Sequence, residues 1–98
     1  MYEAFLEYLQ KEPSYKSGRS ISASSKKYAD AIFIISEEMM ATGVIERSLY
    51  NVTDPNELHK LIIAIFDNQI FIDKNKRGNK MYSNALDHYL HFLKLKKL

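Results

Sequence analysis

Residues 22–43, SASSKKYADAIFIISEEMMATG, contain no proline and no glycine before the final residue, Gly43. Apolar side chains recur through this stretch with the period of a helix, at Tyr28, Ala31, Ile32, Ile35 and Met39, flanked by Phe33, Ile34 and Met40. The spacing predicts a helix over about residues 22–42, which Gly43 ends in a left-handed conformation. Because this helix is apolar over much of its circumference, we expect it at the centre of a helical bundle.

The sequence on either side predicts two helices that pack against the central one. Residues 2–11 carry a single apolar stripe and are followed by Pro13, which stops the helix. The segment Asp54-Pro55-Asn56-Glu57 is typical of a helix start, with a capping aspartate and a proline in the first turn. The apolar residues after it predict an inward-facing stripe that includes Phe66 and can extend to Ile70.

A fourth helix is expected over about residues 82–95, where apolar residues again follow helical spacing. Residues 44–52 are compatible with a short extended segment or with a helical turn that lies on the core. Residues 73–80 are polar and basic around Gly78, which predicts a loop. Together these elements predict an all-α fold, a compact four-helix bundle formed by residues 1–98 as one domain.

Length and composition restrict the class of protein. Ninety-eight residues suffice for one domain with a core of its own. The absence of cysteine excludes disulfides, thiolate nucleophiles and cysteine-ligated metals. The longest apolar run covers residues 31–35, far short of the roughly 20 residues of a membrane helix, and acidic residues near the N-terminus do not suit a secretory signal. We therefore expect a cytoplasmic chain, and its basic C-terminal stretch suggests the N-terminal domain of a longer protein.

No pattern in the chain predicts catalysis, a metal site or a cofactor. His88 and His91 are three residues apart on one helix and could hold a metal only with a third ligand, so we expect them to be solvated or interfacial. The adjacent acids Glu37 and Glu38 point in different directions on a helix, which does not suit general acid–base chemistry. The serines lie in no nucleophile motif, and no glycine-rich phosphate loop is present.

The chain is rich in aromatic residues, with five phenylalanines and seven tyrosines, and this raises the possibility of a stacking platform for single-stranded bases. Helical spacing instead favours core packing for most of them: Tyr2, Phe5, Tyr28, Phe33, Phe66, Tyr89 and Phe92. Tyr15 and Tyr82 differ from these because each lies beside a basic segment.

The net charge of +2 conceals a strong segregation of charge along the chain. Residues 14–27 and 74–98 are basic, whereas the residues between them are acidic. Each basic segment is predicted to be a loop that leads into a helix N-terminus, where unbonded N–H groups, hydroxyls and cations together suit phosphate. The candidate contacts are Lys16, Arg19, Ser22, Ser24, Ser25, Lys26 and Lys27 in the first segment, and Lys74, Lys76, Arg77, Asn79, Lys80, Tyr82 and Ser83 in the second. A pair of solvated loops is the alternative.

Residues 22–32, SASSKKYADAI, residues 49–54, LYNVTD, and residues 78–93, GNKMYSNALDHYLHFL, resemble a helical domain of restriction systems. That domain is found ahead of HNH-type endonucleases and of methylcytosine-targeting restriction GTPases. The helix opening at Ser22 is more distantly similar to the SAM-like core-binding domain of tyrosine recombinases. The resemblance implies that residues 24–27 face DNA, with Ser24 and Ser25 where recombinase domains often have threonine. It also implies that nuclease residues lie outside this chain and allows a structural role for residues 78–83.

Two functional hypotheses follow. The first is an accessory DNA-binding domain of a restriction or mobile-element protein, which contacts the phosphate backbone and reads few bases, since no helix is rich in exposed arginine and asparagine. The second is a protein-interaction or dimerisation module that uses the acidic middle of the chain or residues 89–95, and exposed Phe92 and Leu95 would favour it. A histidine metal enzyme is a weaker third hypothesis.

Overall fold

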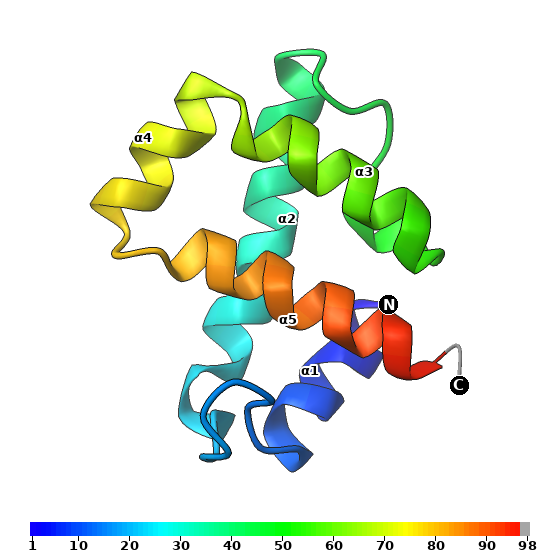
Figure 1. Ribbon diagram of the computed structural model, residues 1–98, viewed down its shortest axis with the longest axis vertical. Helices are drawn as coiled ribbons and strands as arrows, with labels where there is room; N and C mark the ends of the chain where they lie inside the picture. The colour runs from blue at the N-terminus through cyan, green and yellow to red at the C-terminus, as the bar shows by residue number, and fades with distance from the viewer. Residues whose placement is uncertain (97–98) are drawn as a thin grey trace.

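The computed structural model describes residues 1–96, and these residues form an all-α structure, as the sequence predicts (Figure 1). Five α-helices and two 3₁₀ turns follow one another as α1 (Tyr2–Lys11), η1 (Ser22–Ser24), α2 (Ser25–Ala41), η2 (Leu49–Asn51), α3 (Pro55–Phe66), α4 (Gln69–Arg77) and α5 (Met81–Lys96). The only β pairing within residues 1–96 is an isolated bridge between Pro13 and Ser20. No helix in this range combines the length and the apolar character that a bilayer crossing requires.

Helix α2 supplies a large part of the core, but the helix that packs against each of the other four α-helices is α5. Helix α5 crosses it, and α1 packs beside its N-terminal half (Figure 1). Ile32, Ile35 and Met39 are fully or almost fully buried in this core. The predicted widening of the apolar stripe is wrong in part, because Phe33, Ile34 and Met40 are exposed.

Residues 44–52 adopt the helical-turn alternative rather than an extended strand. The η2 turn is held from both sides by buried side chains of the core helices. The Ser36 hydroxyl donates to the carbonyl of Ile32 at 2.7 Å and accepts the N–H of Leu49 at 3.0 Å. The Tyr89 hydroxyl lies 3.1 Å from the carbonyl oxygens of both Leu49 and Val52. The loop backbone is thus bonded to α2 and α5 where water cannot reach it.

The structure corrects the predicted number of helices from four to five. Helix α3 starts as expected, with the Asp54 carboxylate accepting the N–H of Asn56 at 3.3 Å, but it ends at Phe66. A new helix then starts at the cap residue Asn68, whose side-chain oxygen accepts the N–H of Phe71 at 3.2 Å. Residues 73–77 are therefore helical rather than part of a loop. Helix α4 escapes the periodicity analysis because Phe71 is its only buried residue.

Candidate nucleic-acid interface

The first basic segment begins with a tight loop over residues 13–21. The N–H of Ser14 donates to the carbonyl of Arg19, and the N–H of Gly18, which has a φ of 72°, donates to the carbonyl of Ser14, both at 2.8 Å. The hydroxyls of Ser14, Ser17 and Ser20 each accept a backbone N–H two residues further on. These serines therefore stabilise the loop itself, which gives Arg19 a fixed backbone.

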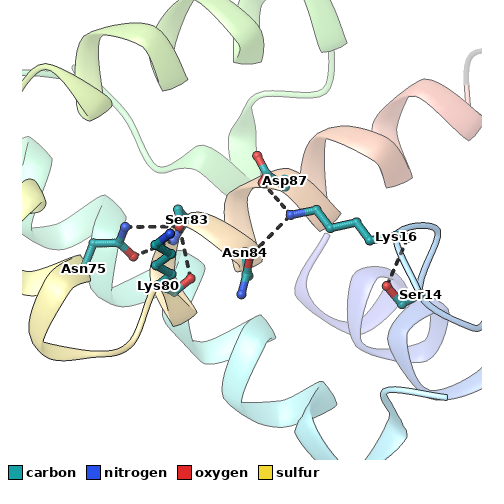
Figure 2. Close-up of polar contacts among 7 residues, drawn as sticks. All are labelled: Ser14, Lys16, Asn75, Lys80, Ser83, Asn84 and Asp87. Carbon is teal, nitrogen blue, oxygen red and sulfur yellow. Dashed lines mark hydrogen bonds and ion pairs between the residues drawn. The ribbon is translucent and has the colours of Figure 1, made fainter. Parts of the chain in front are cut away.

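Lys16 fastens this loop to helix α5. Its Nζ lies 2.7 Å from the carboxylate of Asp87 and 3.3 Å from Oδ1 of Asn84 (Figure 2). The pair is about two-fifths exposed, so its contribution to stability is at most about 1 kcal/mol. Lys16 therefore acts mainly as a tether, and its charge is already balanced within the fold.

The start of α2 differs from the predicted phosphate site. Ser25 is only 3% exposed, and its hydroxyl donates to the carbonyl of Ser22 at 2.8 Å, so Ser25 does not face solvent. Because the 3₁₀ turn η1 precedes the helix, the N–H groups of Ser24 and Ser25 bond to Ile21 and Ser22. The expected cluster of unbonded N–H groups is thus reduced. Ser22 is exposed and its hydroxyl accepts the Ser20 hydroxyl at 3.1 Å, whereas Ser24 is partly exposed and its side chain caps no N–H group.

The two lysines that follow have different surroundings. Lys26 pairs with Asp30 at 2.8 Å, and Asp30 also accepts the Tyr2 hydroxyl at 2.7 Å. The hydrogen bonds from Lys26 and then Tyr2 lower the pKa of the Asp30 carboxyl, which keeps it charged. Lys27 is exposed and has no ion-pair partner within residues 1–96.

The second basic segment contains several residues that serve the fold. Lys74 lies 3.2 Å from Glu38 and 5.4 Å from the centre of the Tyr82 ring. The Asn75 side chain bonds twice to Ser83, accepting its N–H at 2.9 Å and donating to its hydroxyl at 3.1 Å (Figure 2). Asn75 thereby caps the start of α5 from the preceding helix, a role that its sequence position did not reveal. Lys74, Tyr82 and Ser83 are therefore engaged within the protein rather than directed at a ligand.

The turn between α4 and α5 is strained. Asn79 and Lys80 have φ values of 54° and 66°, whereas Gly78, the predicted turn residue, has an ordinary negative φ. A Cβ at position 78 would lie 3.0 Å from the Tyr82 ring, so a larger residue there would require the ring to shift slightly. The Lys80 N–H donates to the Asn75 carbonyl at 2.8 Å, which helps to hold the left-handed pair.

The two basic segments meet at the N-terminal half of α5. Lys16 of the first segment reaches the side chain of Asn84 in the second (Figure 2). Asn84 lies in the first turn of α5, where its N–H bonds to the carbonyl of Lys80 at 3.0 Å. Within residues 1–96, the predicted site cations without an ion-pair partner are Arg19, Lys27, Lys76, Arg77 and Lys80. Lys97, which adds to the charge of the second segment, lies outside the described residues.

A surface groove of about 360 Å³ adjoins the second segment, and we call it the Phe66 groove. Its lining comes from the end of α3, from α4, from the turn and from the start of α5: Phe66, Phe71, Ile72, Asn75, Lys76, Lys80 and Ser83. The sequence assigned Phe66 to the core, but the residue is 40% exposed because α3 ends there. The exposed aromatic residue was missed because its spacing matches that of the core residues before it.

The histidines of residues 1–96 lie mostly against aromatic side chains. His88 is 3% exposed, against the expectation of a solvated or interfacial residue, and lies between the rings of Tyr15 and Tyr28 at centroid distances of 5.4 Å. Burial, followed by the charge of Lys16, lowers the pKa of His88. His91 stacks on Tyr15 at 4.1 Å. No group of three or more potential ligands lies close enough to hold a metal in residues 1–96.

The predicted interaction surface on α5 is also wrong in part. Tyr89 and Phe92 are buried in the core. Of Phe92 and Leu95, whose exposure would favour a protein-interaction surface, only Leu95 is exposed. Exposed apolar side chains occur instead around the junction of α3 and α4, where Ile63 is 58% and Ile70 is 48% exposed.

Comparison with known proteins adds no assignment. No family model matches the chain, and neither a curated protein sequence nor a solved structure is significantly similar to it. The function must therefore be inferred from the site itself.

Proposed function

We propose that this chain is an accessory DNA-binding domain that contacts the phosphate backbone and has no catalytic machinery of its own. The observation that carries the proposal is the contact between the two basic segments, in which Lys16 of the first reaches Asn84 of the second. The segments are far apart in sequence, and Lys16 joins the loop of the first to helix α5 of the second.

The proposed contacts are the exposed cations that the fold does not neutralise. Arg19 projects from the first segment, and Lys76, Arg77 and Lys80 belong to the second. An arginine can form two parallel hydrogen bonds with a phosphate, whereas a lysine supplies a mobile point charge. Neither group distinguishes one base from another when it binds phosphate, so the proposed binding is largely independent of sequence.

The resemblance to restriction-system domains and to the SAM-like recombinase domain supports this class of function. The more distant resemblance to the recombinase domain implies that the start of the second helix, here the start of α2, faces DNA. Lys27 is the residue of that region best suited to the role, because Lys26 is paired and Ser25 is buried. A restriction-system or mobile-element protein is therefore the proposed context for the domain.

Fluorescence anisotropy with a short labelled DNA duplex over a salt series tests the proposal. Four or five phosphate contacts predict a slope of about −3 to −5 in a plot of log affinity against log salt concentration. Lys27→Glu should weaken binding more than Lys26→Glu, since only Lys27 lacks an acidic partner within residues 1–96. Absence of binding at low salt, where electrostatic attraction is strongest, would refute the proposal.

The exposed apolar residues near the α3–α4 junction favour one alternative, a protein-interaction module. Ile63 and Ile70 would be its contacts, in place of the residues of α5 that the sequence suggested. Self-association through them predicts a mass that rises with concentration in sedimentation equilibrium and falls back to the monomer in Ile63→Asp. A monomer at all concentrations would exclude dimerisation.

A further inference from the structure

We propose that the Phe66 groove binds an unpaired base of single-stranded DNA, with the adjacent phosphates on Lys76 and Lys80. This inference rests on the proposed function and extends it from the phosphate backbone to an exposed base. The occupant is a nucleotide within a strand, which combines a planar apolar face with negative charge at either side.

The floor of the groove is a pair of stacked aromatic rings. Phe66 and Phe71 have centroids 5.5 Å apart and ring planes inclined by 17°. Phe71 is 2% exposed and supports the Phe66 ring from the core side, whereas Phe66 is 40% exposed. A base can continue such a stack, because every base presents a flat π-face to an aromatic ring.

Charge selects an anionic occupant. Lys76 and Lys80 line the same groove, are exposed, and have no ion-pair partner within residues 1–96. No acidic residue is among those that line it. An acidic peptide would satisfy the lysines, but its carboxylate side chains present no flat aromatic face to the Phe66 ring, whereas a base does. The combination of a stack and two neighbouring cations therefore favours single-stranded nucleic acid.

The polar wall of the groove is already satisfied and fixed. Asn75 and Ser83 form two hydrogen bonds with each other, and the Ser83 hydroxyl also donates to the carbonyl of Lys80 at 3.1 Å (Figure 2). A base that covers this wall leaves few polar groups without a partner, which keeps the cost of removing water low. The wall also belongs to the cap of α5, so it requires little ordering when a ligand binds.

The chain contains no tryptophan, so Phe66→Trp introduces a single tryptophan at the floor of the groove, which can be excited selectively over the seven tyrosines. Two probes separate base from backbone: an oligothymidylate, and an abasic oligonucleotide of the same length and charge. We expect the oligothymidylate to quench the tryptophan and the abasic strand to bind without quenching. Phe66→Leu, which retains an apolar side chain, should bind oligothymidylate about 5- to 20-fold more weakly and the abasic strand with unchanged affinity.

The outcomes separate this inference from the proposed function. Equal affinity of the native chain for both strands, with no effect of Phe66→Leu, would overturn the base site and leave phosphate binding intact. Failure of both strands and of duplex DNA to bind would overturn both proposals. A blue shift in Phe66→Trp emission that depends on protein concentration alone would mean that a second copy covers the groove, and would also overturn the base site. Thermal melts of both variants confirm that each is folded.

Discussion

Replacing Lys76 and Lys80 together by glutamine isolates the charge of the second basic segment. Both side chains are exposed, and neither forms an ion pair within residues 1–96. Their neutralisation therefore breaks no ion pair in the described fold, and we expect the free energy of unfolding to change by no more than about 0.5 kcal/mol. A loss of DNA affinity in this variant then reports on the interface rather than on stability.

The expected loss follows from counterion release. Each neutralised phosphate contributes about 0.9 to the slope of log affinity against log salt, so that one contact is worth about 8-fold in affinity near 0.1 M salt. Loss of two contacts predicts affinity about 60-fold lower at that salt concentration. It also predicts a slope that is less negative by about 1.8.

Anisotropy titrations of a labelled duplex at several salt concentrations measure both quantities. The matched control is Lys60→Gln with Lys94→Gln, which changes the net charge equally. The first half of α3 and the last turns of α5 lie at the opposite end of the molecule from the 78–80 turn (Figure 1). Equal losses in the two double variants would show that only total charge matters and would refute the assignment of the interface.

Three further predictions concern the framework around the site. Ser36→Ala leaves the buried N–H of Leu49 without its acceptor, so the free energy of unfolding, measured by urea denaturation, should fall by about 1–3 kcal/mol. A change below about 0.5 kcal/mol would contradict this role of Ser36. His88 has a lowered pKa in the fold, so the unfolded chain binds more protons, and stability should fall as the pH drops below the ordinary value of 6.5. His88→Phe should flatten that part of the pH profile, and an unchanged profile would assign the effect to other groups. Lys80→Gly relieves a left-handed lysine and should raise the free energy of unfolding by up to about 1 kcal/mol while weakening DNA binding; a lower melting temperature would contradict the strain.

Much of the fold is predictable because its signals are local. The apolar period of residues 25–41 and the Asp54-Pro55 start both act within a few residues of where they occur. Helix α4 was missed because its stability depends on a side-chain cap at Asn68 and on one buried residue, Phe71. The break between α3 and α4 is not visible in the apolar spacing. Phe66 and Ile70 therefore fall on the apolar stripe of α3 in the sequence, although both are exposed in the structure.

The candidate site was predictable at the level of segments but not of individual residues. Local charge identifies two basic segments, yet two of their lysines are neutralised by acids that are distant in sequence. Lys16 pairs with Asp87, 71 residues away, and Lys74 pairs with Glu38, 36 residues away. Such pairs depend on how the helices cross, which the sequence pattern does not specify. The structure therefore separates cations that hold the fold from those that remain available to a ligand.

The second basic segment contains residues that stabilise the fold next to cations that remain available to a ligand. Asn75 and Ser83 hold the start of α5, and Lys74 ties α4 to α2 through Glu38. These contacts fix the turn so firmly that Lys80 is kept in a left-handed conformation, at a cost of about 1–2 kcal/mol for a residue with a Cβ. A glycine at position 80 would avoid that cost but would carry no charge beside the Phe66 groove. If the proposed function holds, Lys80→Gly should therefore move stability and DNA affinity in opposite directions.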